Sequence, residues 1–198
     1  YDDGSGETIS KTWNELVALG INDDGNYTIK LKVVDNNGGE DTNTTSIVVN
    51  NVAPNVNAPS SVSGNEGSSI TIGTAAFTDP GTADTHTASI NWGDGSITNV
   101  GSVSGNVPSK SHTYSDNGVY TVTITVTDDD GGAGSATLTA TISNVPPRIS
   151  GTADQTGNEG SPITFTAGTV TDPGTADTFQ YRWDWNNDGS YDTSWSSS

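Results

Sequence analysis

The sequence predicts an all-β protein built from tandem immunoglobulin-like antiparallel β-sandwiches, and three observations lead to this prediction. Whole phrases recur 93 positions apart along the 198 residues. Apolar and polar residues alternate over several short segments, as they do in strands that bury one face. Turn-forming Gly, Pro and Asp residues separate these segments at short intervals. About seven strands therefore fit into each repeat, which is typical of this sandwich.

The repeat divides the chain into modules placed end to end. The phrase Asn-Glu-Gly-Ser at residues 65–68 returns at residues 158–161, and residues 78–85 return unchanged at residues 171–178. Self-similarity at a fixed period indicates an array in which each repeat is one structural unit. We therefore expect three parts: the C-terminal half of a module at residues 1–50, a complete module at residues 51–143, and the N-terminal half of a further module at residues 144–198.

Strand candidates follow one another along the complete module at residues 61–63, 70–77, 88–92, 97–103, 109–114, 120–127 and 136–142. The clearest is residues 120–127, where Tyr, Val and Ile alternate with Thr. Its copy at residues 27–34 keeps the apolar face and places Lys on the other face. The Asp- and Gly-rich turn at residues 128–132 predicts a hairpin between the last two strands. Residues 13–19 are helix-like but lie where the repeat has an irregular connection, so we expect a loop or short strand there.

Composition limits the partners and the sources of stability. The chain carries 24 acidic and 6 basic residues, for a formal net charge of −18 at pH 7. Nucleic acids and anionic membranes require clusters of Lys and Arg, so neither is expected as a partner, whereas divalent cations are the natural counter-charge. The acidic residues also fit a plainer role, which is to keep a β-array soluble. The chain has no Cys, which fits a cytosolic protein or a microbial surface protein without disulfides.

Several phrases of the complete module resemble the polycystic kidney disease (PKD) domain family. These phrases are Asn91-Trp92-Gly93-Asp94-Gly95-Ser96, His112-Thr113-Tyr114, Gly118-Val119-Tyr120-Thr121-Val122 and Val126-Thr127-Asp128. The third repeat carries Trp185 followed by Asn-Asn-Asp-Gly in place of the first phrase. The resemblance implies an immunoglobulin-like sandwich of extracellular multidomain proteins, which serves as a spacer, adhesive or accessory module and not as a catalyst.

Topology brings three oxygen-rich segments of the predicted sandwich to the same end of a module. They are the incoming linker, the loop between the second and third strands, and the turn between the last two strands. Two or three carboxylates with an amide oxygen suit a hard cation such as Ca²⁺, and the sequence offers no thiolate or histidine cluster for a transition metal. The candidate calcium ligands are Asn51, Asp79, Asp84 and Asp128 in the complete module, Asn144, Asp172 and Asp177 in the next, and Asp35 as the earlier copy of Asp128.

The resemblance adds to the calcium prediction. Some bacterial collagenase PKD domains, which this sequence resembles, bind calcium through a linker Asn, loop aspartates and the last Asp of the Thr-Asp strand. Asn51 and Asp128 match that pattern well. The loop at residues 79–84 matches less closely, because Pro-Gly-Thr-Ala separates its two carboxylates. The alternative is that Asp79 and Asp128 only cap turns.

A second candidate calcium loop lies in the third repeat. Asp184, Asn186 and Asp188 occupy the first, third and fifth positions of a calcium-loop pattern, with Gly189 at the sixth. Trp195 stands where such a loop carries its bidentate Glu. The complete module has only a tight turn at the corresponding place, so a plain turn is the alternative to a calcium loop.

The sequence offers little for catalysis, and we expect no enzyme activity. His86 and His112 are the two histidines, and His112 falls in a phrase where a packing role is favoured over base chemistry. Trp92 and its copy Trp185 are expected in cores. Trp13 and Trp195 lie outside the repeated phrases. If exposed, they would stack on a glycan or dock a protein, and otherwise they fill local gaps.

These patterns together predict a non-catalytic structural segment, such as a spacer, stalk or fibre, of a large extracellular or cell-surface microbial protein with calcium-stiffened joints. The alternative is a glycan- or protein-binding accessory module of a secreted hydrolase. Neighbouring PKD-like modules, in the same or an adjacent chain, would complete the two end halves, and completion by separate chains would give a head-to-tail filament. No apolar stretch predicts membrane insertion, and residues 1–10 lack a signal-peptide pattern, which fits a mature segment or an excised piece.

Overall fold

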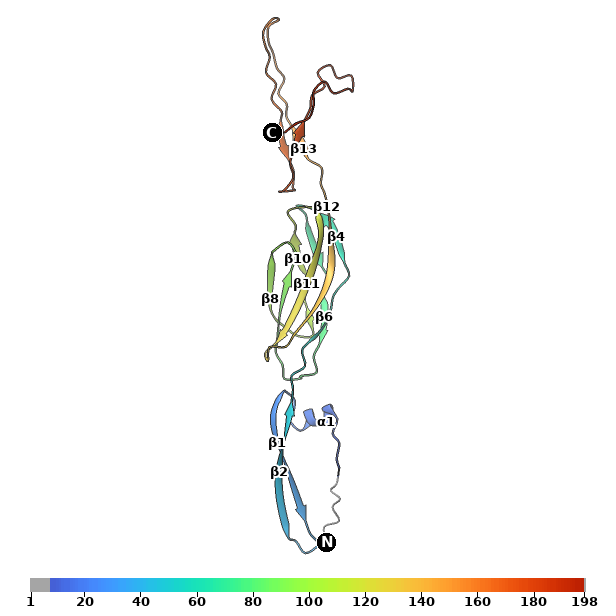
Figure 1. Cartoon of the computed structure of the whole chain (residues 1–198), viewed down its shortest axis with the longest axis vertical. Helices are drawn as coiled ribbons and strands as arrows, with labels where there is room; N and C mark the ends of the chain where they lie inside the picture. The colour runs from blue at the N-terminus through green and yellow to red at the C-terminus, as the bar shows by residue number, and fades with distance from the viewer. Residues whose placement is uncertain (1–7, 198) are drawn as a thin grey trace. The chain divides into compact units, whose positions relative to one another are not determined.

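The structure is a computed structural model that describes residues 8–197, and strands dominate it (Figure 1). This confirms the all-β prediction. The chain divides into two units, which are described separately. The first comprises the residues up to 60 together with 73–109 and 122–138, and the second comprises 61–72, 110–121 and the residues from 139 onward. The module boundaries inferred from the repeat stay a prediction.

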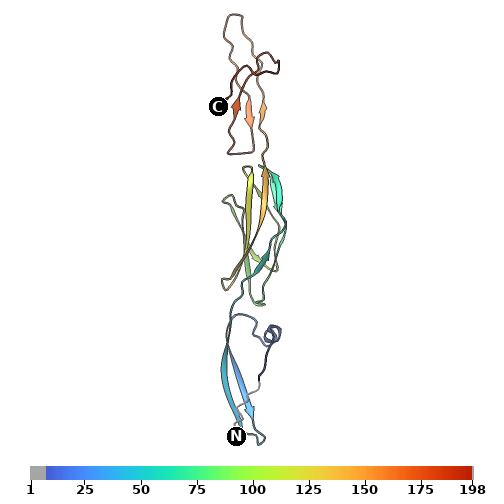
Figure 2. The same cartoon turned by 45° about the vertical axis from the view of Figure 1, so that its right-hand side comes forward.

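The first unit begins with a short helix and a long hairpin. Helix α1 (Trp13–Ala18) starts at a capping box, in which Thr12 Oγ1 accepts from the Glu15 backbone N–H and the Glu15 carboxylate accepts from the Thr12 N–H. Strands β1 (Gly25–Val34) and β2 (Glu40–Val49) pair antiparallel over their whole lengths, as Figure 2 also shows. The expected loop or short strand at residues 13–19 is therefore wrong, because the local capping signal decides the conformation there.

The hairpin keeps the predicted alternation but leaves its apolar face open. Ile29, Leu31 and Val33 lie on one face of β1, and all three are exposed. In a sandwich, a face of this kind packs against a second sheet. Its cover by a neighbouring PKD-like module, in the same or an adjacent chain, stays a prediction.

The rest of the first unit consists of two groups of paired strands. Strand β6 (Ala75–Thr78) pairs antiparallel with β3 (Asn55–Asn57) and β9 (Asn106–Val107). Strand β7 (His86–Asn91) pairs antiparallel with β8 (Ile97–Val103) and with β11 (Gly118–Asp128). Strand β11 also neighbours β12 (Ala133–Ser143), which confirms the predicted hairpin.

The second unit holds shorter strands. Strand β5 (Ser69–Ile72) pairs antiparallel with β10 (Lys110–Thr113), and β4 (Val62–Asn65) pairs parallel with the end of β12. Strand β13 (Arg148–Ser150) pairs antiparallel with β14 (Thr169–Thr171), and β15 (Gln180–Tyr181) pairs with β16 (Ser196–Ser197). The single strand expected at residues 70–77 is two strands, β5 and β6, because the chain changes sheets at residues 73 and 74.

The buried faces confirm the alternation that the sequence predicted. Every second residue of β11 is buried from Val122 to Asp128. Trp92 is completely buried, as expected, and its indole N–H donates to Thr98 Oγ1 at 2.9 Å. Its copy Trp185 is 54% exposed, so the core role expected for it is wrong. Trp185 instead stacks on Trp183, with 5.2 Å between ring centroids, in a region where the strands are only two or three residues long.

Candidate metal-binding sites

Two copies of one loop make the same contact with the residues of the preceding repeat. Thr82 Oγ1 donates to the Asn22 carbonyl at 3.4 Å, and its copy Thr175 donates to the Ser115 carbonyl through Oγ1 at 3.4 Å and through its backbone N–H at 2.9 Å. Donors and acceptors both lie 93 positions apart. We call the region around residues 79–84 the first joint and the region around residues 172–177 the second joint. The first lies within the first unit and the second within the second unit.

Two tyrosines fix the turns that carry the acceptor carbonyls. The Tyr27 hydroxyl donates to the Asp23 carbonyl at 2.8 Å, and the Tyr120 hydroxyl donates to the Asp116 carbonyl at 2.9 Å. These positions are again repeat copies. A tyrosine hydroxyl bonded to a carbonyl a few residues upstream is a known way of holding a corner in immunoglobulin-like sandwiches. At each joint, a tyrosine hydroxyl therefore holds the turn of the preceding repeat that supplies the acceptor carbonyl.

The loop of each joint brings two carboxylates close together. Asp79 Oδ1 accepts from the Gly81 N–H at 2.9 Å, and its copy Asp172 accepts from the Gly174 N–H at 2.7 Å. A Cβ atom at Gly81 would collide with the carboxylate of Asp84. A larger residue at this position would have to displace the Asp84 carboxylate from its place over the first turn.

At the first joint, carboxylates from three segments meet. Single ligand atoms of Asp79, Asp84 and His86 lie within 4.8 Å of one another, and so do those of Asp23, Asp84 and Asp130. Burial raises the pKa of Asp84 to about 6, helped by a hydrogen bond with Asp23 and by the charge of Asp79. The pKa of Asp130 is also raised to about 6, first by a hydrogen bond with Asp24 and then by burial. This region concentrates negative charge that a cation would relieve.

Asn51 and Asp128 lie beside this cluster and bond to each other. Asn51 Nδ2 donates to Asp128 Oδ2 at 3.0 Å, and the Gly132 N–H donates to Asp128 Oδ1 at 2.6 Å. Asp128 is 6% exposed, and its charge contributes to the raised pKa of Asp84. The structure thus brings Asp79 and Asp84 together within one group, while both carboxylate oxygens of Asp128 accept hydrogen bonds from the protein.

The predicted ligand of the first repeat, Asp35, bonds to its own turn. Asp35 Oδ1 accepts from the backbone N–H groups of Asn37 and Gly39, at 2.8 Å and 2.7 Å, which caps the turn between β1 and β2. Within residues 8–197, Asp35 belongs to no group of metal-ligating side chains. The structure therefore places it apart from both joints.

The candidate loop at residues 184–192 is held by its own backbone amides. Asp184 accepts from the N–H groups of Asp188 and Gly189, at 3.3 Å and 3.0 Å, and Asp188 Oδ1 accepts from the Ser190 N–H at 2.8 Å. Asn186 Nδ2 donates to Asp188 Oδ2 at 2.9 Å. The three predicted side chains therefore lie close together, and each already takes part in turn-forming hydrogen bonds.

The second joint gathers a different set of carboxylates. Single ligand atoms of Glu66, Asp172 and Asp177 lie within 4.8 Å of one another. The Asn144 amide lies beside them, and with Nδ2 turned toward the carboxylates it donates to Glu66 Oε1 at 3.0 Å and to Asp177 Oδ2 at 3.2 Å. Asn144, Asp172 and Asp177 were predicted from the sequence. Glu66 was not.

Four side chains of the acidic groups were missed by the prediction, and two of them come from the repeat before the loop. Asp23 and Glu66 belong to the repeat before the loop that they face, and Asp130 and His86 flank predicted ligands. A repeat comparison alone could have found Asp23, because Asp23 and its copy Asp116 hold the same place in the repeat. Glu66 stands in a repeated phrase too, but nothing in that phrase indicates that the side chain is buried against another repeat.

The two histidines are both engaged by neighbours. His86 Nε2 lies 3.1 Å from Asp79 Oδ2, and the two side chains are largely buried. His112 packs edge-on against Tyr114, with 4.6 Å between ring centroids. These contacts fit packing and hydrogen-bonding roles for both residues.

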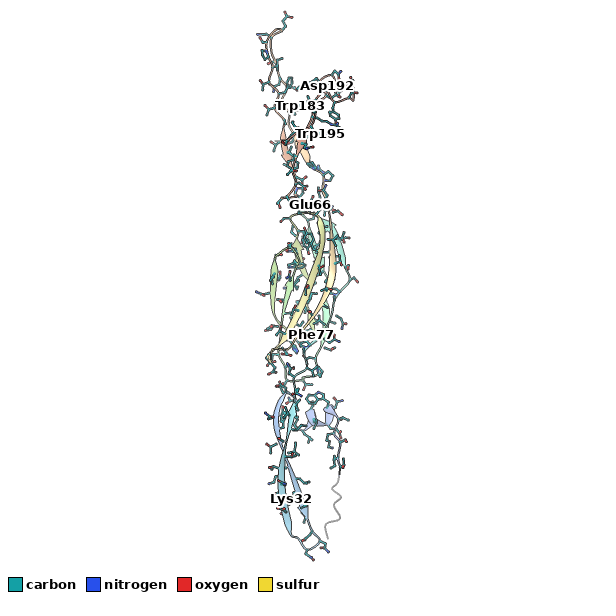
Figure 3. All side chains as sticks on the ribbon, in the orientation of Figure 1. Lys32, Glu66, Phe77, Trp183, Asp192 and Trp195 are labelled. Carbon is teal, nitrogen blue, oxygen red and sulfur yellow. The ribbon has the colours of Figure 1, made fainter. Side chains whose placement is uncertain are left out.

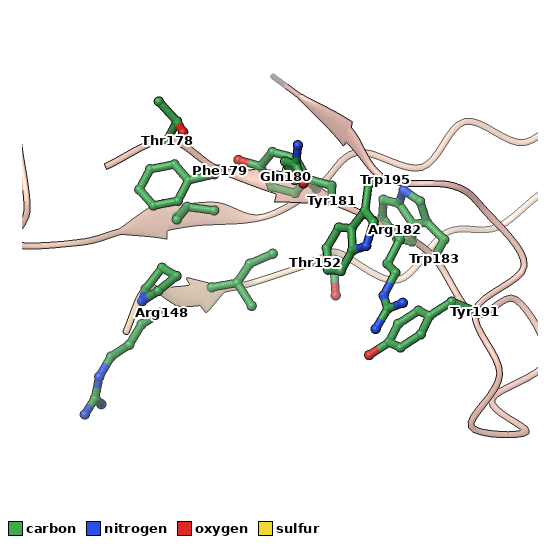
Figure 4. A pocket seen from close by; sticks show the side chains of 14 residues that line it. Arg148, Thr152, Thr178, Phe179, Gln180, Tyr181, Arg182, Trp183, Tyr191 and Trp195 are labelled. Carbon is green, nitrogen blue, oxygen red and sulfur yellow. The ribbon is translucent and has the colours of Figure 1, made fainter. Parts of the chain in front are cut away.

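The predicted ligand-binding tryptophans lie in different surroundings. Trp13 is half-buried on α1, and its indole N–H donates to the Pro80 carbonyl of the first joint at 3.0 Å. Trp195 is 56% exposed and lines a cavity of about 380 Å³ in the second unit (Figure 4). In that cavity the Arg182 guanidinium carbon lies 3.6 Å from the Tyr191 ring centroid and 4.3 Å from that of Trp195.

Comparisons with known proteins gave one matching family and several similar solved structures. The profile of the PKD domain family matches residues 51–143. The chain is similar to the PKD domain of an M14-like peptidase from a Thermoplasmatales archaeon, at 32% identity and a TM-score of 0.37, covering 46% of this chain and 92% of that one. It is also similar to fibronectin(III)-like modules of Clostridium thermocellum CbhA, at 18% identity and a TM-score of 0.39, covering 60% of this chain and 63% of that one. No curated protein matches the chain.

Among residues 8–197, no helix is both long enough and apolar enough to cross a membrane.

Proposed function

The chain belongs to the PKD domain family, and from this premise we propose that it is a non-catalytic spacer or stalk segment of an extracellular microbial protein, with calcium-stiffened joints. PKD domains are non-catalytic accessory or structural modules that typically occur in extracellular proteins. A spacer needs joints that hold successive modules in a defined relation, and a cation is one way to obtain them.

The observation that carries the proposal is the repeated joint. The bond from Thr82 to the Asn22 carbonyl and the bond from Thr175 to the Ser115 carbonyl are the same contact, one repeat apart. Each joint also has an acidic group beside that contact. A contact that recurs with the period of the array belongs to the array, and an accidental surface contact would not be expected to recur in this way.

Calcium fits the first joint because of the chemistry of its side chains. The carboxylates of Asp23, Asp79, Asp84 and Asp130 offer oxygen ligands, which Ca²⁺ prefers. Among residues 8–197, no Lys or Arg forms an ion pair with these carboxylates, so the protein does not balance most of their negative charge. A divalent cation would lower the repulsion that raises the pKa of Asp84.

Stiffening would follow from where the ligands originate. Asp23 lies in the first repeat, whereas Asp84 and Asp130 lie in the second. A cation held by side chains of both repeats would add bonds across the joint that depend on the free calcium concentration. The joint would then change from a small hydrogen-bonded contact to a cross-linked one.

Small-angle X-ray scattering of the 198-residue chain tests this proposal. We expect the maximum dimension to increase with calcium and to decrease with chelator, and Asp84→Asn should abolish the difference at the first joint. Asp35→Asn is the matched control, because Asp35 is also a turn aspartate but lies in no acidic group of the described residues. Scattering curves that do not change with calcium would contradict calcium stiffening.

One observation favours a second candidate function, in which the chain binds a glycan. The cavity lined by Trp195, Tyr191 and Arg182 offers exposed aromatic rings and a cation, which suit stacking on a sugar. A polysaccharide pull-down by the chain that is lost in Trp195→Ala and kept in Trp13→Ala would favour this candidate. Trp13 serves as the control because its indole bonds to Pro80.

A further inference from the structure

Glu66 is a buried acid that the joint contact described above does not explain. It is 1% exposed and lies in the turn between β4 and β5 at the second joint (Figure 3). Its backbone N–H donates to the Ser143 carbonyl at 3.1 Å, and its Oε1 accepts from the Val145 N–H at 2.6 Å. Its Oε2 is buried and has no hydrogen-bond partner. A buried carboxylate oxygen left in this state costs free energy.

A second oxygen at the same joint shares this condition. Asp172 Oδ1 accepts from the Gly174 N–H, whereas its Oδ2 is buried and has no partner. In the other copy of the loop, at the first joint, the corresponding oxygen is Asp79 Oδ2, and it bonds to His86. The residue 93 positions after His86 is Phe179, which cannot donate a hydrogen bond.

Two carboxylates of this group approach the same glycine. A Cβ atom at Gly174 would lie 3.1 Å from Glu66 Oε2 and 2.7 Å from Asp177 Oδ2, so both carboxylates approach the bare backbone there. Of the ion pairs formed by residues 8–197, none involves Glu66, Asp172 or Asp177. The protein itself thus leaves this group of acids without a counter-charge.

A divalent cation would satisfy these oxygens together. Three carboxylates from two repeats, with one amide oxygen, form the all-oxygen ligand set that Ca²⁺ prefers, and no thiolate or imidazole belongs to the group. The Asn144 amide lies within 3.2 Å of two of the carboxylates, so its oxygen reaches the same place when the amide is turned the other way.

We propose that Glu66, Asp172 and Asp177, with Asn144, bind one calcium ion, and that Glu66 makes this ion a bridge between the complete module and the module after it. The inference rests on the proposed function, in which calcium stiffens the joints, and it assigns the second joint its own site with a ligand from the preceding module. Glu66 has a definite role in this site. It supplies the only carboxylate of the group that comes from the repeat before the loop.

Calcium stoichiometry tests the proposal, measured by equilibrium dialysis of the full chain at saturating and at limiting calcium. We expect Glu66→Gln to remove one bound ion, or to weaken one site by a factor of about ten or more, because calcium affinity follows the number of charged ligands. Glu159→Gln is the matched control, since Glu159 is the repeat copy of Glu66 and is exposed. Asp84→Asn reports on the first joint alone.

Thermal melting of the same variants separates a ligand from a residue that only packs. In chelator, Glu66→Gln should raise the melting temperature, because it removes one of three repelling charges. In saturating calcium the same substitution should lower it, because it removes a ligand. Gln keeps an oxygen that accepts from the Val145 N–H, so the fold of the turn is preserved. A purely structural Glu66 would shift the melting temperature in the same direction under both conditions.

The outcomes distinguish this inference from the proposed function. If Glu66→Gln binds calcium with wild-type stoichiometry and affinity while Asp84→Asn loses an ion, the second site is overturned and calcium at the first joint stands. If Glu66→Gln loses an ion and Asp84→Asn does not, the second site stands and calcium at the first joint is overturned. If the wild-type chain binds no calcium, both are overturned.

Discussion

The two joints are built from the same repeated loop, yet they satisfy their acidic side chains differently. At the first joint Asp79 Oδ2 has His86 as a partner, and both oxygens of Asp128 accept hydrogen bonds. At the second joint Asp172 Oδ2 has no partner, and neither has Glu66 Oε2. For the first aspartate of the loop, the difference traces to the position after the repeated phrase, which is His86 in one copy and Phe179 in the other.

This comparison shows that a repeated phrase does not define a site by itself. The eight residues 78–85 and 171–178 are identical, so the loop geometry is repeated, including the bond from each first Asp to the glycine two residues later. What differs is the set of groups that surround the loop. These groups decide whether a carboxylate is paired by the protein or needs a cation.

The largest expected effect is the response of both joints to calcium. A ligand at about 100 times its dissociation constant stabilises the folded state by about 2.7 kcal/mol for each site, which raises the melting temperature by roughly 5–10 °C in a chain of this size. Differential scanning calorimetry with calcium and with chelator measures this shift. Equal melting temperatures under the two conditions would show that neither joint binds the ion.

Exchanging the residue that differs between the joints gives the next largest effect. In chelator, His86→Phe should lower the free energy of unfolding by about 1–3 kcal/mol, because it leaves the largely buried Asp79 side chain without its donor. Phe179→His should supply Asp172 with the donor that it lacks. Denaturant unfolding in chelator measures both variants. If His86→Phe leaves the free energy of unfolding unchanged, the pairing that distinguishes the first joint is contradicted.

Removing the tyrosine hydroxyl that holds each acceptor turn should give a smaller loss of stability, and the loss should be equal at the two turns. Tyr27→Phe and Tyr120→Phe each remove one hydroxyl hydrogen bond, to the Asp23 and Asp116 carbonyls, and each should cost about 0.5–1.5 kcal/mol. Denaturant unfolding measures both costs under the same conditions. A cost at only one of the two tyrosines would mean that the two turns do not hold the joints in the same way.

The smallest expected effect is the pH dependence of the calcium-free chain. The folded-state pKa values of Asp84 and Asp130 are raised to about 6, so the folded state gains protons that the unfolded state releases. The free energy of unfolding in chelator should therefore rise as the pH falls from about 7 to about 5. Conversely, this added stability is lost as the pH rises through about 6. In calcium the trend should reverse, because protons compete with the ion. Melting curves that are independent of pH in chelator would contradict the crowding of these carboxylates.

The sequence was sufficient for the fold class because the signals of its strands and turns are local. Alternation in residues 120–127 predicts the buried face of β11, and the turn at residues 128–132 predicts the hairpin that follows. Helix α1 was missed although its Thr12 and Glu15 capping pair is also a local signal. Residues 13–19 lie where the repeat has an irregular connection, so the repeat pattern predicts no helix there.

The site was only partly predictable because it depends on contacts between repeats. Asp79 and Asp84, and their copies Asp172 and Asp177, stand close together in the chain, and the structure brings each pair into an acidic group. Glu66 reaches its group from more than 100 residues away, through a burial that its own phrase does not reveal. Its copy Glu159 carries the same phrase and is exposed.

The most direct test of calcium stiffening is the width of a distance distribution across the first joint. The chain has no Cys, so spin labels at Asn43→Cys and Ser102→Cys, two exposed positions on β2 and β8, would be unique. Pulsed electron–electron double resonance should give a narrower distribution in calcium than in chelator, and Asp84→Asn should remove the difference. Distributions of equal width with and without calcium would contradict the account.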